Sequence, residues 1–382
     1  MPSLGSQEYI RDMNSRLVLG EIIHKEPISR AKIAKNLGLT KATVSSIVQT
    51  FIDSGYVIEI GSLDTNKGRK PILLKFKADC AFTLSVYLNV DSTTILIANL
   101  RGQNRQIFSY PGICEGTSPS DQLCQYIENA MGHCPPSRYG IVGIAVGVLG
   151  VVHRNVIQFT PYYKVDRPAL ADYLTERFHV PAYIENEANL SALGEKTFFH
   201  SYPSLININV HAGVGMGIIL DQHLYTGLNG YAGEFGHTII EPDGKPCPCG
   251  NRGCIEQYAS ERAIVNMYRE LKNNPALTAS HLTEEYHRGD ADAKMCICTF
   301  VKYMSIALNN ILNIFNPDIV IINSVFTADI PGLTDEITHH MSNSFNRGCT
   351  FVSASEDQNT VILLGGCCAC TKGFLKIKDL QF

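Results

Sequence analysis

One histidine, three cysteines and two glutamates fall within a short segment rich in glycine and proline. Residues 233–256 read GEFGHTIIEPDGKPCPCGNRGCIE. Three thiolates and one imidazole are the donors that tetrahedral Zn²⁺ prefers, and the intervening Gly and Pro residues allow tight turns between them. The expected ligands are His237, Cys247, Cys249 and Cys254. Because no protein ligand is missing, we expect one closed structural zinc ion. Buried cysteines beside a surface histidine are the alternative.

The order of these residues resembles the signature of the ROK family. The resemblance rests on G-E-F-G-H followed by C-P-C-G-N-R-G-C-I-E. This family comprises sugar kinases and sugar-responsive transcriptional repressors, and its repressor branch carries an N-terminal DNA-binding domain. The resemblance extends over nearly the whole chain.

Length and composition indicate an ordinary globular protein of more than one domain. The chain has 382 residues, of which 45% are hydrophobic, so two or three domains are expected. It has no uncharged apolar run of eighteen residues and no signal-peptide core, which predicts a cytoplasmic protein without a membrane partner. Of its 13 cysteines, those outside the zinc segment are expected to be reduced thiols.

The charge is distributed unevenly along the chain. Residues 1–78 hold 12 Lys and Arg against 7 Asp and Glu, a net charge of +5. The remainder holds 20 against 29, a net charge of −9. The basic N-terminal part is therefore the candidate for binding a polyanion such as DNA.

The first eighty residues predict a helix-turn-helix. A helix is expected over residues 11–24, and Ser29 and Thr40 are suitable N-caps for two more. After Thr40, apolar residues recur at helical spacing over residues 44–51, which predicts one buried face. The opposite face is short and polar, as a recognition helix in the major groove requires.

A basic wing is expected to follow the recognition helix. Residues 56–60 and 72–76 alternate like paired strands, and the segment between them contains the basic residues of a wing tip. Its G-R-K-P-I-L-L sequence resembles that of ROK repressors. A structural three-helix domain is the alternative. The expected DNA-contacting residues are Ser29, Thr40, Lys41, Ala42, Thr43, Ser45, Ser46, Gln49, Lys67, Arg69 and Lys70.

The remaining three hundred residues predict a layered α/β fold. Strand-like apolar runs alternate with helical stretches. The expected strands are residues 82–87, 94–99, 141–148, 206–210, 217–220 and 319–322. The resemblance implies two actin-like lobes of ribonuclease-H-like topology with a sugar cleft. We expect a winged helix-turn-helix at 1–78, a first lobe at 79–190, and a second lobe at 191–382 whose C-terminal helix can return to the first.

The segments that hold ATP in the family's kinases are altered in this chain. Bulky residues occupy 87–91, where kinases have an acidic residue and glycines. The second glycine turn is half kept at 211–215, and Asn323-Ser324 replaces a Gly-Gly pair. Glycines let backbone N–H groups approach phosphates closely. We therefore expect a protein that is not an enzyme and does not bind ATP.

The segments that bind sugar in the family are retained more fully in this chain than the segments that bind ATP. Residues 185–189, ENEAN, resemble a family segment in which an Asn holds the sugar and an Asp acts as base. Glu187 stands at the place of that base, as in xylose-type repressors, and is expected to be vestigial. A solvated helix start is the alternative. Val146-Gly147-Val148-Leu149-Gly150 and Tyr162 depart from the family pattern, which leaves an unusual, modified or phosphorylated sugar open. The expected sugar-binding residues are Asn186, Glu187, Glu234, His237 and Glu256.

The sequence thus predicts a sugar-responsive repressor. Its expected partners are a palindromic operator and a carbohydrate effector, and its expected assembly is a homodimer or homotetramer. Two alternatives stay open. One is a ROK sugar kinase that also binds DNA, and the other is a regulator controlled by a protein partner.

Overall fold

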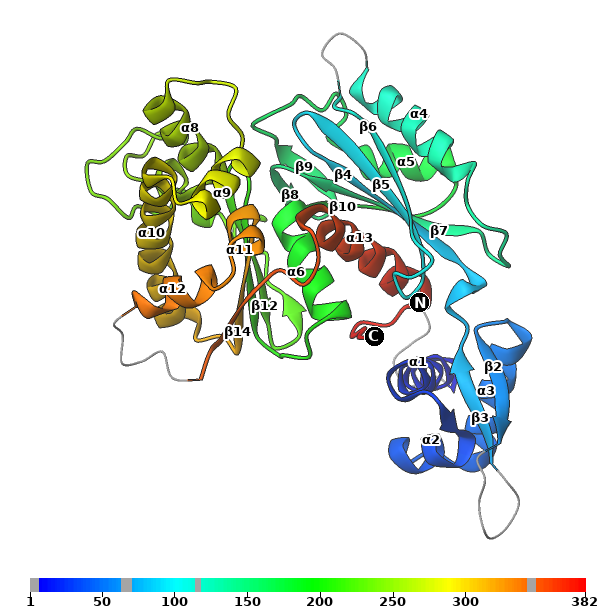
Figure 1. Cartoon of the computed structure of the whole chain (residues 1–382). Helices are drawn as coiled ribbons and strands as arrows, with labels where there is room; N and C mark the ends of the chain where they lie inside the picture. The colour runs from blue at the N-terminus through cyan, green and yellow to red at the C-terminus, as the bar shows by residue number, and fades with distance from the viewer. Residues whose placement is uncertain (1–6, 63–70, 114–117, 342–347) are drawn as a thin grey trace. The chain divides into compact units, whose positions relative to one another are not determined.

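The computed structural model describes residues 7–62, 71–113, 118–341 and 348–382. The chain forms two compact units. The first comprises Met1–Val146, Tyr163–Ile184 and Gly366–Phe382, and the second comprises Gly147–Tyr162 and Glu185–Gly365. Figure 1 labels their helices and strands. The three-part division at residues 78 and 190 stays a prediction.

The N-terminal part of the first unit is a winged helix-turn-helix, as the sequence predicts. Its strands pair in the order β1-β3-β2. Its elements are α1 (Gln7–Lys25), β1 (Ile28–Ser29), α2 (Arg30–Leu37), α3 (Lys41–Asp53), β2 (Val57–Ser62) and β3 (Ile72–Phe76). The two predicted N-caps are confirmed. Ser29 Oγ accepts from Lys32 N at 3.3 Å, and Thr40 Oγ1 accepts from Thr43 N at 3.1 Å.

Helix α3 has the buried and exposed faces expected of it. Val44, Ile47, Val48 and Phe51 are buried in the core of the winged helix domain. The opposite face is exposed and uncharged apart from one lysine. Its exposed members are Lys41, Ala42, Ser45, Ser46 and Gln49.

The winged helix packs against the rest of the first unit through aromatic rings. Tyr56, just before β2, stacks on Tyr139 with ring centroids 5.3 Å apart, and Phe374 meets both rings edge-on. The Tyr139 hydroxyl donates to the Ser54 carbonyl oxygen at 2.8 Å. These contacts bury rings from three distant stretches of sequence and fix the DNA-binding domain on its neighbour.

Arg101 forms a second connection in this interface. Its guanidinium lies 2.7 Å from Glu26 Oε1 and donates to the Ile23 carbonyl oxygen at 3.0 Å. It also lies 5.0 Å from the ring centroid of the C-terminal residue, Phe382. Because the side chains of Arg101 and Glu26 are only 19% and 10% exposed, this pair is little screened by water.

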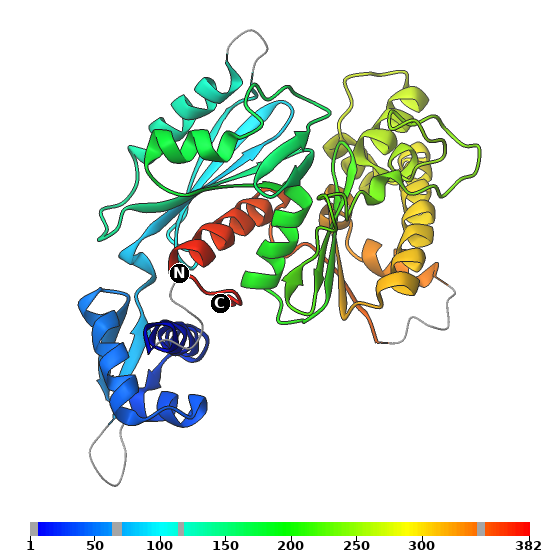
Figure 2. The ribbon, with the colours of Figure 1, turned by 180° about the vertical axis from the view of Figure 1, so that it is seen from behind.

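The remainder of the first unit is a five-stranded sheet between helices. Its order is β10-β7-β4-β5-β6. The strands are β4 (Phe82–Leu88), β5 (Ser92–Asn99), β6 (Gln106–Pro111), β7 (Ile141–Val148) and β10 (Ala182–Asn186). Helices α4 (Pro119–Met131) and α5 (Leu170–Phe178) lie on one face and α13 (Gln358–Leu375) on the other (Figures 1 and 2). A Cβ at Gly366 of α13 would lie 2.0 Å from Ser85 Oγ, so this helix lies directly on β4.

The second unit contains another five-stranded sheet, of order β13-β12-β11-β14-β15. Its strands are β11 (Leu205–Val210), β12 (Val214–Leu220), β13 (His223–Leu224), β14 (Ile319–Ser324) and β15 (Thr350–Ser353). Strands β11 and β14 are parallel, with Leu205 beside Ile319. The six runs predicted as strands all lie in strands of the two units.

The two faces of this second sheet belong to two different cores. Ile206, Ile208, Val320 and Ile322 point into a large core shared with several helices. Those helices include α8 (Glu261–Lys272), α10 (Ala291–Phe315) and α12 (Leu333–His339). Alternate residues such as Leu205 form a smaller core with α6 (Glu187–Phe198). This is the two-residue period of a strand covered on both faces.

Helix α10 is long and apolar enough to cross a membrane by length and composition alone. Its buried residues, among them Phe300, Met304 and Leu308, lie in the large core with β11 and β14. Its apolar character is therefore explained by burial within the second unit.

We predict that Arg101→Met loosens the attachment of the winged helix. The substitution leaves Glu26 partly buried without its cation, which should lower the free energy of unfolding by about 1–3 kcal/mol. Urea unfolding measures this loss. Arg288→Met is the matched control, because the Arg288–Glu285 pair is exposed and contributes little. Equal effects of the two substitutions would contradict the role given to Arg101.

Candidate metal centre and adjoining pocket

The four predicted metal ligands lie together in the second unit. The ligand atoms of His237, Cys247, Cys249 and Cys254 are all within 4.8 Å of one another. Cys247 Sγ lies 3.6 Å from His237 Nδ1, and Cys249 Sγ lies 3.7 Å from Cys254 Sγ. Zn–S and Zn–N bonds of about 2.3 and 2.0 Å would make tetrahedral edges of roughly 3.5–3.8 Å. The donor types and their spacing therefore fit a tetrahedral metal ion.

The segment that carries these ligands is mostly irregular backbone, held by tight turns and two isolated bridges. Ile239 pairs with Cys254, and Pro246 pairs with Arg252. At Gly253 the backbone has φ +81°, and a Cβ there would lie 1.7 Å from the Glu241 carbonyl oxygen. Only glycine fits this position, which explains why the sequence places glycine directly before the last cysteine.

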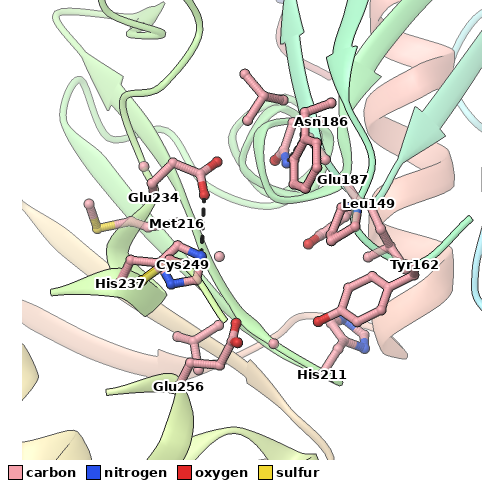
Figure 3. A pocket seen from close by; sticks show the side chains of 18 of the residues that line it. Leu149, Tyr162, Asn186, Glu187, His211, Met216, Glu234, His237, Cys249 and Glu256 are labelled. Carbon is pink, nitrogen blue, oxygen red and sulfur yellow. Dashed lines mark hydrogen bonds and ion pairs between the residues drawn. The ribbon is translucent and has the colours of Figure 1, made fainter. Parts of the chain in front are cut away.

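His237 connects the metal centre to a neighbouring pocket. Its Nδ1 faces Cys247, whereas its Nε2 lies 3.9 Å from Glu234 Oε2. Figure 3 shows this second contact as a dashed line. One ring nitrogen of His237 thus faces a candidate metal ligand and the other faces a pocket carboxylate.

The pocket is a cavity of about 450 Å³ lying within the second unit. Glu234, His237 and Glu256 lie on one side, and Leu149 and Tyr162 lie on the other (Figure 3). Glu256 begins the short helix α7 (Glu256–Ala259), two residues after Cys254. The metal loop therefore positions two of the pocket's carboxylates, Glu234 before it and Glu256 after it.

Glu187 is the most buried of the pocket carboxylates. It is 6% exposed and begins helix α6. Burial raises the pKa of its carboxyl to about 7, although a hydrogen bond from Asn209 Nδ2 to Oε2 opposes the rise. Glu234 also has a raised pKa because of burial, partly offset by His237. Burial therefore raises the pKa of two of the pocket's carboxyl groups, Glu187 and Glu234.

Glu187 is bonded to a network of buried side-chain amides through Asn209. Asn209 Oδ1 accepts from Asn207 Nδ2 at 2.8 Å and from Asn323 Nδ2 at 3.1 Å, and both of those amides also donate to Ser191 Oγ. Alternation along β11 and β14 puts the three asparagines on the face that α6 covers. A polar layer thus replaces the apolar core where the sheet meets the pocket.

Asn186 lines the pocket, but most of its amide is engaged. Its Oδ1 caps α6 by accepting from Ala188 N at 2.8 Å and Asn189 N at 3.2 Å. Its Nδ2 donates to the Gly150 carbonyl oxygen at 2.8 Å. One amide hydrogen remains for a ligand, so a sugar contact by Asn186 stays a prediction.

Sequence reasoning did not assign Arg262, Tyr162 or His211 to the pocket, and all three line it. Arg262 Nη2 lies 3.5 Å from Glu256 Oε1, and its guanidinium lies 5.8 Å from the centroid of the Tyr162 ring. His211 has a buried Nε2 with no hydrogen-bond partner among the described residues, and burial lowers its pKa to about 4. For Tyr162 and His211, their departure from the family pattern was the sequence signal that could have indicated a place in the pocket. Arg262 gave none, because a helical arginine is ordinarily a surface residue.

The predicted DNA-contacting residues within the described part of the chain all lie in the winged helix domain. The predicted wing-tip residues Lys67, Arg69 and Lys70 lie outside the described residues. Beside α3, Thr43 and Ser46 line a groove together with Gln7, Arg11 and Asn14 of α1. The start of α1 thus places the basic residue Arg11 next to two of the predicted residues.

We predict that removal of the metal unfolds the loop at residues 238–255. Protein purified without chelator should hold about one metal ion per chain, and a chelator should lower its melting temperature, because binding energy at such sites is folding energy. Elemental analysis and calorimetry measure the two quantities.

Cys254→Ser should lose the metal. Cys298→Ser, at an exposed cysteine on α10 outside the cluster, should keep it. The assignment would be contradicted if protein purified without chelator held no metal, or if a chelator left its melting temperature unchanged.

Glu187 predicts a pH dependence of stability. Its pKa in the folded protein is about 7, above the ordinary value of 4.5. Its contribution is therefore fully present below pH 4.5 and is lost as pH rises to 7, because the unfolded chain releases this proton first. Relative to Glu187→Gln, the wild type should lose about 1 kcal/mol of unfolding free energy between pH 6 and 8. Urea unfolding at both pH values measures the difference, and parallel curves would contradict it.

Known protein families match both the N-terminal domain and the remainder of the chain. The model of the ROK family matches residues 90–366, and a model of winged helix-turn-helix DNA-binding domains matches residues 11–58. A xylose repressor of Bacillus spizizenii is 34% identical over 345 residues, covering 89% of each chain.

Solved structures show the same fold. A ROK family transcriptional regulator, described as a homolog of the E. coli MLC protein, has a TM-score of 0.79 at 23% identity and covers 97% of this chain and 99% of its own. A ROK family glucokinase from Streptomyces griseus, in complex with glucose and AMPPNP, has a TM-score of 0.67 at 22% identity. That match covers 75% of this chain and 98% of the glucokinase.

The ROK family model covers the pocket and the metal loop, and the winged helix-turn-helix model covers most of the N-terminal domain. The chain therefore belongs to the ROK family, in its branch of sugar-responsive transcriptional repressors with an N-terminal winged helix-turn-helix.

Proposed function

We propose that the pocket of the second unit binds xylose or a sugar closely similar to it, and that this binding controls the affinity of the winged helix for operator DNA. The observation that carries the proposal is the convergence of Glu187, Glu234 and Glu256 on one cavity. Carboxylates accept hydrogen bonds from hydroxyl groups and fix their directions. The similarity to the Bacillus spizizenii xylose repressor supports xylose as the first sugar to test.

The charge of the pocket favours an unphosphorylated sugar. Three acidic side chains line it, and the cation Arg262 already lies close to Glu256. A phosphate group would meet the repulsion of the remaining carboxylates at short range in a partly buried site. A neutral sugar meets hydrogen-bond acceptors instead.

The pocket is proposed to be a sensor without phosphoryl transfer. Asn323 and Ser324 occupy the position of the kinases' glycine pair, and their side chains are engaged within the protein. Asn323 bonds to Asn209 and Ser191, and Ser324 caps α11 (Val325–Asp329). At the second glycine turn, the ring of His211 occupies space at the pocket wall. These side chains support a pocket that has lost close backbone contact with phosphates.

The metal is proposed to be a structural Zn²⁺. With four protein ligands present, it would leave no open position for a reacting water. Its role would be to hold His237 in one orientation and to fix the loop that ends at Glu256. Indirect positioning of this kind is what metal centres commonly supply to neighbouring residues.

The repressor is further proposed to work in the cytoplasm as a homodimer or homotetramer. A palindromic operator has two half-sites at a fixed helical spacing, and two winged helices related by a two-fold axis match them. A small change in the separation of the two domains would then cost binding energy at one half-site.

Operator binding in the presence of sugars tests the proposal. We would select the operator from a random-sequence library and measure its binding to the metal-loaded full chain by fluorescence anisotropy. Xylose should change the operator Kd by about 5–150-fold, the usual range of allosteric coupling. Glu234→Gln should keep the sugar-free operator affinity and lose the response.

An unchanged operator Kd with xylose, glucose and N-acetylglucosamine would overturn the proposal. The metal content of the Glu234→Gln variant is the control, because Glu234 lies beside His237. A response that appears only with a cell extract would favour regulation by a protein partner.

A sugar kinase remains the second candidate because of Glu187. A buried carboxyl with a pKa of about 7 is well matched to accept a proton near neutral pH. A coupled assay with ATP and the same sugars separates the two functions. Turnover that Glu187→Gln abolishes would establish the kinase.

A further inference from the structure

We propose that the pocket's effector is a disaccharide, with one sugar ring among the carboxylates and a second ring stacked on Phe159. This inference rests on the proposed function, because it extends the same pocket. The structural observation is an apolar stretch of the cavity wall that includes an exposed aromatic residue.

The apolar side comes from one short stretch of chain. Leu149, Val151, Phe159 and Pro161 all line the cavity, and all lie within residues 149–161. The described lining residues of this stretch carry no charge. Glu187 lies beside Leu149, and Glu234 and Glu256 lie across the cavity from them (Figure 3). A sugar ring has hydroxyl groups at its edge and C–H groups on its faces, so it needs both kinds of surface.

Phe159 lies at the rim of the cavity. It lines the cavity and is nevertheless 57% exposed, while Leu149 and Val151 are 6% and 5% exposed. A lining residue with this much exposed surface can contact a part of the ligand that extends toward solvent. Apolar surface exposed to water is unfavourable, so covering a face of the phenylalanine ring with a bound sugar would favour binding.

Strand pairing fixes the backbone of Phe159. Phe159 is the last residue of β9 (Val156–Phe159), and it pairs with Val151 of β8 (Val151–His153). A Cβ at Gly150 would lie 2.1 Å from the Phe159 carbonyl oxygen, so the two chains are in close contact there. Because the backbone of Phe159 is already fixed in the free protein, the protein loses little conformational freedom when a sugar ring stacks on this side chain.

The size of the cavity agrees with a ligand larger than one pentose. Its volume of about 450 Å³ lies in the class of pockets, roughly 300–1,000 Å³, that enclose drug-sized molecules. A pentose has five carbons and five oxygens and is smaller than that class. A second ring would use the remaining space and the exposed aromatic face.

Calorimetric titration of the metal-loaded full chain with xylose and with xylobiose tests the inference. Xylobiose should bind roughly tenfold more tightly than xylose, as expected for one additional aromatic contact. Phe159→Ala should remove that preference by weakening xylobiose alone and leaving the xylose Kd within about twofold. Phe159→Tyr keeps an aromatic ring and should keep the preference.

Phe199→Ala is the matched control. Phe199 is 36% exposed in the same unit and does not line the cavity, so its removal should change neither Kd. Melting temperature and metal content establish that each variant is folded.

The outcomes separate this inference from the proposed function. If xylose binds and changes operator affinity but xylobiose binds no more tightly, the inference is wrong and the sugar sensor stands. Equal weakening of both sugars by Phe159→Ala also overturns it. If neither sugar binds, both proposals fail.

Discussion

The geometry of the pocket depends on four side chains that are grouped as candidate ligands of one metal ion: His237, Cys247, Cys249 and Cys254. The segment that supplies the ligands has little regular structure and is held by isolated bridges and turns. Without a metal, three of its cysteines and one histidine would be close together with no strong attraction between them. With a metal, their bonds fix both ends of the loop, and Glu234 and Glu256 are placed as a consequence.

The second support of the pocket is a set of hydrogen bonds inside the sheet. Strand alternation sends Asn207, Asn209 and Asn323 to the face that α6 covers, and Asn209 then bonds to Glu187 at the start of that helix. Polar groups buried this deeply are costly unless they are paired. Their presence at one end of the sheet marks a site whose carboxyl must be held in one place, even at some cost in stability.

Helix α6 is in turn in close contact with α13. A Cβ at Gly194 would lie 2.3 Å from the Val361 carbonyl oxygen, and Glu195 Oε1 accepts from Ser355 N at 2.8 Å just before α13 begins. The same helix α13 supplies Phe374 to the aromatic contact with the winged helix. Helix α13 thus contributes residues to both units, Val361 to the second and Phe374 to the first.

The sequence by itself determined the winged helix, the six expected strands and the grouping of the metal ligands, since these follow from local signals. Caps, strand and helix periodicity, and the spacing of cysteines around Pro and Gly act over a few residues. The place of Glu187 at the head of a helix was equally local. Only the tertiary structure decided that Arg262, His211 and Phe159 share a pocket with Glu187, and that Arg101 meets Glu26. Those residues are far apart in the chain and are brought together by sheet order and packing, which no short-range pattern encodes.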